Sequence, residues 1–211
     1  MRNKLLHKPF TKNNKFAFSI IEIIIAIFIF SMWIVSIYAV ITSTLKLNDY
    51  NKNYIIASSL ASEQIEFVRN IRDSNYKQIK KYNLINPLST DYNNKFDIDK
   101  KYKIENNYST LANFPIKVEN ITSWFEEGKE KINWTSMQSY RLCLDSKNRY
   151  TYDCSSWNKK TNFYKYISIE KFTNSNWNIQ NAFIVRSKVI WTIWGYKEFE
   201  VKTIIADFKR L

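Results

Sequence analysis

The sequence predicts an α+β protein in which one long N-terminal helix packs on a small antiparallel β-sheet. Residues 16–41 form an apolar segment with a single charge and neither glycine nor proline. Residues 54–73 carry apolar side chains at three- and four-residue steps, which is the period of an amphipathic helix. Residues 183–205 contain two runs in which apolar and polar side chains alternate, as in a β-hairpin. With 211 residues, the chain has room for one ordinary domain and an accessory segment.

The apolar segment is long enough to cross a membrane. Phe18–Ile41 comprises 24 residues, and a helix of that length is about 36 Å long, against about 30 Å for the hydrocarbon core of a bilayer. A secretory signal peptide has a shorter apolar region, of about 7–15 residues, followed by a small-residue cleavage site. No such site follows Ile41. We therefore expect a single transmembrane helix at residues 18–41.

The charges on the two sides of this segment predict its orientation. The residues after it have mixed charge, with Lys46, Asp49 and Lys52. The basic residues before it are Arg2, Lys4, Lys8, Lys12 and Lys15, with no acidic residue among them. Because positively charged flanks remain in the cytoplasm, we expect a cytoplasmic N-terminus and an exported C-terminal portion.

Glu22 is the one charged residue of the apolar segment. A carboxylate near the start of a lipid-facing helix carries a desolvation cost of several kcal/mol unless it is paired or neutralised. No Lys or Arg lies between Phe16 and Tyr38. Cleavage between Ala17 and Phe18 would create an ammonium group about one helical turn away, within reach of a neighbouring copy. The alternative is that Glu22 is an accidental polar residue in a plain single-pass anchor.

Residues 15–30 resemble the type III signal of type IV prepilins and type II secretion pseudopilins. That signal has a basic leader, then Gly-Phe-Thr-Leu-Ile-Glu, then a long apolar helix. In this chain Ala17 takes the place of the Gly before the cut, and Phe18 takes the place of the usually N-methylated first residue. Ser19-Ile20-Ile21 stands for Thr-Leu-Ile. The resemblance implies that residues 1–17 are a leader removed by a prepilin peptidase.

The resemblance also implies a function and a set of partners. Glu22 would neutralise the N-terminal amine of an adjacent subunit during filament assembly. The chain would be a structural subunit, a minor pilin or pseudopilin, that contacts other subunits, the prepilin peptidase and an inner-membrane assembly platform. It would start as a single-pass protein of the cytoplasmic membrane and end in a surface or periplasmic filament. Whether the filament is a pilus, a secretion pseudopilus or a competence filament stays open.

The apolar helix is predicted to continue into a stem at residues 42–74, ending at about Ser74. Ile65 lies off the apolar stripe, and we expect it to touch a partner. Surface ion pairs are predicted for Glu66 with Arg69 and for Arg69 with Asp73. The apolar stripe consists of Ala57, Leu60, Ala61, Phe67, Val68 and Ile71. The stem also looks like that of minor pilins and of pseudopilins of the I-subunit type.

Residues 75–211 are predicted to form a globular head with a pilin-like arrangement of stem and sheet. Residues 75–113 show little periodicity and include Pro87, so we expect them to wrap the head irregularly. The C-terminal hairpin is predicted to consist of two half-buried strands. Further candidate strands lie at Phe163–Phe172 and at Tyr140–Asp145.

Cys143 and Cys154 are the only cysteines. An even pair in an exported domain, separated by a polar and turn-rich segment, favours a disulfide. The alternative is two free thiols. Two thiolates alone are a poor metal site, and no metal site is predicted.

The composition argues against an enzyme. The single histidine, His7, lies in the predicted leader, which removes Ser-His and Cys-His nucleophile pairs from the mature chain. A phosphate-binding loop would need more than Gly128 and Gly195, the two glycines present. We therefore predict no catalytic residue and no cofactor.

The net charge supports a second functional hypothesis. The chain has a net charge of +13, and removing the five basic residues of the leader leaves +8. Aromatic residues make up 17% of the chain. Basic surfaces with exposed aromatics suit single-stranded nucleic acid, so the head could be a filament-borne module for DNA uptake or surface adhesion. The alternative is a compositional bias that leaves the charges on a solvated surface.

Overall fold

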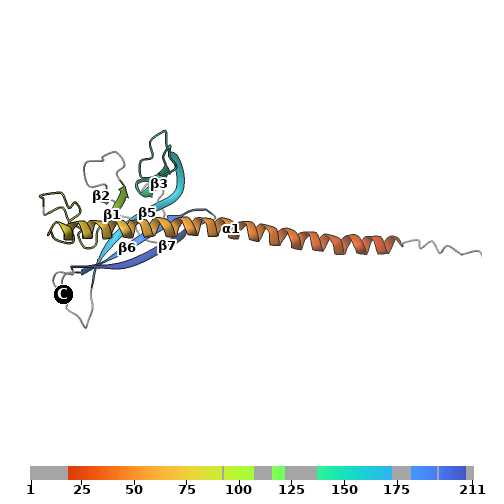
Figure 1. The fold of residues 1–211 in the computed structure, drawn as a ribbon. Coiled ribbons are helices and arrows are strands. Elements are labelled where there is room, and N and C mark those ends of the chain that lie inside the picture. The colour runs from red at the N-terminus through yellow and green to blue at the C-terminus, as the bar shows by residue number, and fades with distance from the viewer. Residues whose placement is uncertain are drawn as a thin grey trace, which may run out of the picture. The chain divides into compact units, whose positions relative to one another are not determined.

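A computed structural model of the chain describes residues 19–91, 93–106, 116–121, 137–172, 182–193 and 195–207. It contains one long helix, α1 (Ile20–Lys77), and a seven-stranded antiparallel sheet, so the predicted α+β class is confirmed (Figure 1). Helix α1 ends three residues beyond the predicted end. The chain forms two compact units, residues 1–48 and 49–211. The second unit contains the head, residues 75–211, with its sheet, together with the part of α1 from Asp49 onward.

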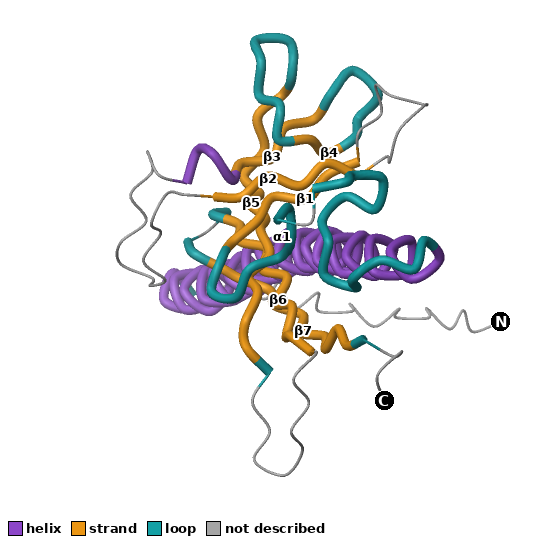
Figure 2. The backbone as a smooth tube through the Cα atoms, turned by 90° about the vertical axis from the view of Figure 1, so that its left-hand side faces the viewer, coloured by secondary structure: helices purple, strands orange, loops and turns teal. Residues whose placement is uncertain are grey.

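The sheet is organised around one long strand, β5 (Lys159–Lys171) (Figure 2). One edge of β5 pairs with β6, from Phe163 opposite Trp191 to Lys171 opposite Phe183. The other edge is shared by β3 and β1. Strand β7 pairs with β6, β2 with β1, and β4 with β3. The remaining elements are β1 (Lys101–Asn106), β2 (Ile116–Ile121), η1 (Gln138–Tyr140), β3 (Arg141–Leu144), β4 (Tyr150–Thr151), β6 (Ala182–Trp191) and β7 (Lys197–Ala206).

The strands that the sequence indicated are present. Strands β3, β5, β6 and β7 lie where the alternating runs predicted them. The expectation that residues 75–113 are irregular is wrong for β1, and β2 and β4 were not expected. Strand β1 has only two buried side chains, Tyr102 and Ile104, among charged neighbours. Its extended conformation depends on pairing with β2 and β5, because strand propensity is strongly dependent on sheet context.

The C-terminal part of α1 packs on the sheet through the predicted stripe, and all six of its residues are buried. The expectation for Ile65 is wrong: it is 3% exposed and belongs to the core, together with Tyr102, Ile167 and Val185. Viewed down the helix axis, where successive residues are about 100° apart, the buried side chains span roughly 160° of the circumference. Phe67 lies at one limit of this arc and Ile65 at the other. The stripe is wider than expected because the head covers more of α1 than one narrow face.

Strand β6 is buried on both faces, whereas the sequence predicted a half-buried strand. Val189 faces α1 and packs with Leu60 and Phe163. Its neighbour Ile190 belongs to a separate buried cluster on the opposite face, together with the four residues Met137, Tyr140, Tyr164 and Tyr166. The segment around η1 therefore supplies a second apolar layer on the sheet, which no local pattern in β6 indicates.

A polar network joins α1 to the sheet within this core. The buried Ser187 Oγ donates to Gln64 Oε1 at 2.7 Å, and Gln64 Nε2 donates to the Tyr152 hydroxyl at 3.4 Å. The Tyr152 hydroxyl in turn donates to the carbonyl of Lys165 at 2.9 Å. The buried Lys165 ammonium pairs with Glu63 Oε2 at 2.9 Å. Because each polar atom needs its partner in place, the network specifies one position of α1 on the sheet.

Burial raises the pKa of the Tyr152 phenol well above its ordinary value, and the nearby carboxylates of Glu105 and Glu63 raise it further. The phenol is therefore neutral at physiological pH and can act as a donor to the Lys165 carbonyl. On the outer side of α1, the predicted pair of Glu66 and Arg69 is present at 2.5 Å. Asp73 pairs with Arg72 at 2.8 Å, where the sequence had suggested Arg69.

Replacing Glu63 with Ala should lower the free energy of unfolding by about 1–3 kcal/mol, because the buried Lys165 ammonium loses its carboxylate. Glu66→Ala is the matched control. Glu66 lies on the same helix and pairs with a partly exposed Arg69, so its loss should change stability by no more than about 0.5 kcal/mol. Denaturant unfolding of the full chain in detergent micelles, followed by tryptophan fluorescence, measures both. Equal effects of the two variants would contradict the network.

Candidate assembly site

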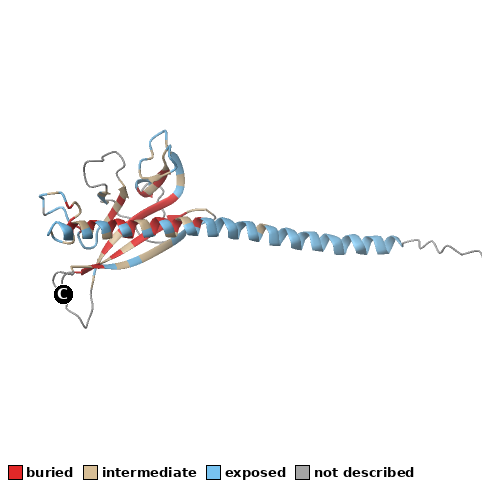
Figure 3. Cartoon of the chain, in the orientation of Figure 1, coloured by how far each residue is buried: buried red, intermediate tan, exposed pale blue. Residues whose placement is uncertain are grey.

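The first unit presents an apolar helical surface. From Ile20 to Leu47 the large apolar side chains of α1 are exposed, including Phe28 at 65% and Trp33 at 69% (Figure 3). This part of α1 is long and apolar enough to cross a membrane, and none of its most apolar stretch is buried. Such a surface is unstable in water, since burying a large apolar side chain is worth about 1.5–3 kcal/mol. The segment therefore requires lipid or other protein around it.

Four hydroxyl groups within this surface, those of Ser31, Ser36, Thr42 and Thr44, donate to carbonyls of the helix itself. Ser31 Oγ donates to the carbonyl of Ile27 at 2.7 Å, and Ser36 Oγ donates to that of Met32 at 2.9 Å. Thr44 Oγ1 likewise donates to the Val40 carbonyl at 2.9 Å. These hydroxyls need no water, which suits an environment without it. Glu22 is the one acidic or basic residue from Ser19 to Leu45, and so the one charge that the segment carries.

Glu22 lies in the first turn of α1 and caps it. Ser19 is the residue before the helix, and its carbonyl accepts from the backbone N–H of Glu22 at 3.0 Å. The Glu22 side chain also contacts Ser19, since its carboxylate Oε2 accepts from the backbone N–H of Ser19 at 3.0 Å. This is half of a capping box, in which the residue three positions into the helix reaches back to the cap. The sequence Ser19-Ile20-Ile21-Glu22 thus explains where the helix starts.

The cap gives Glu22 a local role in addition to the predicted contact with another subunit. Ser19 was predicted only as part of the signal, yet the Ser-x-x-Glu spacing before an apolar run is a recognisable cap signature. One carboxylate oxygen satisfies the Ser19 amide, but a neutral amide leaves the negative charge uncompensated. The predicted cleavage residues Ala17 and Phe18 lie outside the described residues, so their roles stay predictions.

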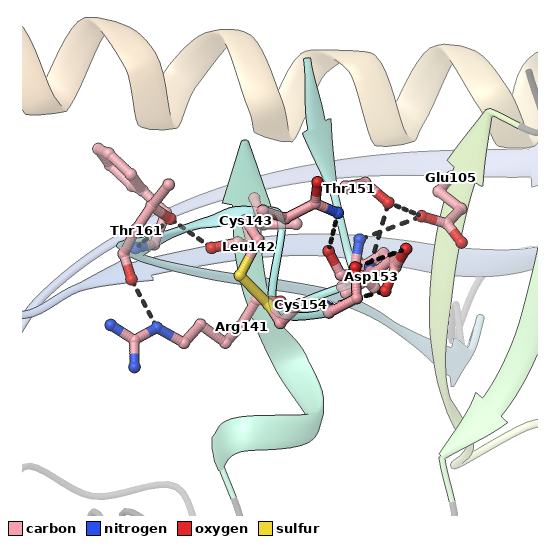
Figure 4. Close-up of a disulfide and its surroundings, with 12 residues drawn as sticks. Glu105, Arg141, Leu142, Cys143, Thr151, Asp153, Cys154 and Thr161 are labelled. Atoms are coloured by element: carbon pink, nitrogen blue, oxygen red, sulfur yellow. Dashed lines mark hydrogen bonds between the residues drawn. A yellow bond between two sulfur atoms is a disulfide. The ribbon is translucent and has the colours of Figure 1, made fainter. Parts of the chain in front are cut away.

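The predicted disulfide is present. Cys143 Sγ and Cys154 Sγ are bonded at 2.00 Å, with their Cα atoms 5.3 Å apart (Figure 4). It links β3 to the segment after β4. Nearby, Thr161 Oγ1 donates to the Leu142 carbonyl at 2.6 Å, and Arg141 Nε donates to the Thr161 carbonyl at 2.7 Å. The bridge and these bonds together hold the end of the sheet to which β4 belongs.

Within the described ranges, no group of three or more His, Cys, Asp or Glu side chains is placed to hold a metal ion. No protein-family model, no curated protein and no solved structure matches the chain. Glu22 and the exposed apolar surface of α1 are the features of the chain that point to a function.

Removing the disulfide should destabilise the head by up to about 3 kcal/mol, because the bridge closes a short loop in the unfolded chain. The double variant Cys143→Ala with Cys154→Ala is compared with the wild type by thermal unfolding of the full chain in detergent. Reductant should lower the melting temperature of the wild type and leave that of the double variant unchanged. A reductant effect of the same size on both proteins would show that the bridge is not responsible.

Proposed function

We propose that this chain is a structural subunit of a type IV pilus or of a type II secretion-like filament, a minor pilin or pseudopilin with a pilin-like arrangement of stem and head. The observation that carries the proposal is the single carboxylate of Glu22 at the start of an apolar helical segment, Ile20 to Leu47, whose large apolar side chains are exposed. A plain membrane anchor needs no charge there, whereas an assembly helix needs a specific contact between subunits.

Processing would supply the missing countercharge. A prepilin peptidase that cuts between Ala17 and Phe18 creates an ammonium group at the N-terminus of the mature chain. The Ser19 amide engages one oxygen of Glu22, and a carboxylate can accept further donors on its other oxygen. The ammonium of an adjacent subunit would thus meet a carboxylate already oriented by the cap. A charged hydrogen bond of this kind contributes about 1.5–3 kcal/mol.

The apolar surface provides the rest of the assembly energy. In the proposed cycle the helix begins in the cytoplasmic membrane, with a cytoplasmic leader and an exported head. An inner-membrane assembly platform then moves it from lipid to the apolar helices of other subunits. Because both surroundings are apolar, the transfer costs little, and packing and the Glu22 contact decide the position of the subunit. The absence of proline from α1 favours a minor or initiating subunit over a major one.

Cleavage is tested directly by mass. In cells with an active prepilin peptidase, the membrane-extracted chain should lack residues 1–17 and begin at Phe18. Ala17→Gly should be processed at least as well, whereas Ala17→Trp should accumulate uncut, because the residue before the cut must be small. Intact-mass spectrometry distinguishes these products. A wild-type chain that keeps its first 17 residues beside an active peptidase would overturn the proposal.

Two substitutions separate the charge of Glu22 from its cap. Glu22→Gln keeps a side chain that can cap Ser19 but removes the charge, and Glu22→Ala removes both. Both should reduce incorporation into filaments by about tenfold or more, measured as the fraction of subunit in sheared filaments.

Ser31→Ala is the matched control for this test. Its hydroxyl bonds within its own helix, so its loss should leave assembly unchanged. Normal assembly of Glu22→Gln would mean that Glu22 serves only as a helix cap, and the proposed pairing between subunits would be wrong.

A further inference from the structure

Among the described residues of the head, Trp157 has an almost fully exposed indole. Trp157 lies in the turn between β4 and β5 and is 93% exposed. No other large apolar side chain among the described residues is as exposed, the next being Ile79 at 83%. A tryptophan left in water forgoes the stabilisation that its burial would bring, and contributes nothing to the fold around it.

A disulfide and hydrogen bonds hold the backbone of the turn that presents Trp157. The disulfide anchors it at Cys154. Asp153 Oδ1 accepts from the backbone N–H of Ser155 at 3.0 Å, and Asn158 Nδ2 donates to the Asp153 carbonyl at 2.8 Å. The backbone that carries the indole is therefore ordered before any ligand arrives, which reduces the entropic cost of binding. We call residues 145–160, the two turns with β4 between them and the first two residues of β5, the basic tip.

The charges of the basic tip favour an anionic ligand. Of its two acidic residues, Asp145 pairs with Arg149 Nε at 2.8 Å, whereas Asp153 accepts from the Ser155 amide and keeps its charge. Four cations against two carboxylates, 4 − 2, leave the tip a net charge of +2. Hydrogen bonds from the backbone and side chain of Arg149 lower the pKa of Asp145, which keeps its carboxylate ionised and paired. The exposed cations of the tip are Lys147, Lys159 and Lys160.

Lys159 and Lys160 do not lie on one face of the tip. Lys159 lies opposite Leu144, and Lys160 lies opposite Cys143, in the pairing of β5 with β3. Consecutive residues of a strand point to opposite faces of the sheet, so these two ammonium groups lie on opposite sides of the tip. A planar bilayer would meet the lysine of one side, whereas a flexible polyanion can contact both.

We propose that the basic tip binds single-stranded nucleic acid, with Trp157 stacking on one base and the three lysines contacting phosphates. Single strands offer unstacked base faces together with a flexible phosphate backbone, and both are needed here. A duplex hides its base faces and would use the lysines alone. The inference rests on the proposed function only for its location, since the filament is what would display the tip outside the cell.

The binding test uses the full chain in nanodiscs of zwitterionic lipid, with a dye-labelled oligothymidylate followed by fluorescence anisotropy at several salt concentrations. Trp157→Ala should weaken binding about 5- to 100-fold, and Trp157→Phe should restore part of the loss, because a ring remains for stacking. Each of Lys147→Ser, Lys159→Ser and Lys160→Ser should reduce the salt slope by about 0.7.

The controls lie elsewhere on the head. Tyr76→Ala removes an aromatic ring that is 54% exposed, and Lys81→Ser removes an exposed cation, both near the end of α1. Neither should change the affinity. An unchanged affinity of Trp157→Ala, equal affinities for the single strand and its duplex, or binding to anionic vesicles but not to the oligonucleotide would each overturn the inference.

The two proposals fail separately. Trp157→Ala subunits should still be cut and incorporated into filaments, because Trp157 lies in the head and not in the assembly helix. Glu22→Gln subunits in nanodiscs should still bind the oligonucleotide. A loss of oligonucleotide binding with normal assembly therefore addresses the tip alone.

Discussion

The head depends on the packing of one helix against one sheet. The part of α1 from Asp49 onward buries about 160° of its circumference, with Ile65 at one limit and Phe67 at the other. Apolar contacts of this kind tolerate sliding, since one aliphatic side chain replaces another at little cost. Sliding would break two polar contacts, the hydrogen bond from Ser187 to Gln64 and the ion pair of Lys165 with Glu63. A displaced helix would leave buried polar groups without partners, so the polar network selects one register for an otherwise permissive interface.

The part of α1 that lies in the first unit is exposed, whereas the part in the second unit is buried on one side. From Ile20 to Leu47 its large apolar side chains are exposed, and the hydroxyls of Ser31 and Ser36 bond to carbonyls of the helix. Glu22 is the exception, because its hydrogen bond to Ser19 orients the carboxylate and leaves the charge uncompensated. A group that caps a helix in one molecule and attracts a cation from another can couple helix formation to assembly. The cap also fixes the position of the carboxylate along the helix axis, which a frayed helix terminus would not do.

The two proposals place assembly and ligand recognition in different parts of the chain and give them different physics. Proposed assembly would depend on desolvation and on a charge that becomes buried between subunits, which salt affects little. Proposed ligand binding would depend on exposed charges and an exposed ring, and would respond steeply to salt. The disulfide bears on the second proposal, because it anchors Cys154 to β3 next to the turn that carries the exposed Trp157.

The sequence by itself determined the features that consecutive residues encode. The apolar run, the 3.6-residue stripe of the stem and the alternation in β5, β6 and β7 are local periods, and the disulfide was limited to one pairing because the chain has two cysteines. The contact of the Glu22 carboxylate with the Ser19 amide was not predicted, although the spacing of these two residues is local too.

The tertiary structure decided what depends on surfaces that meet across the chain. Ile65 is buried because the head covers a wide arc of α1, β1 is a strand because β2 and β5 pair with it, and Ile190 is covered because the η1 segment folds over the second face of the sheet. Burial and strand pairing depend on two segments that are far apart in the sequence. The local sequence of either segment alone therefore does not determine them.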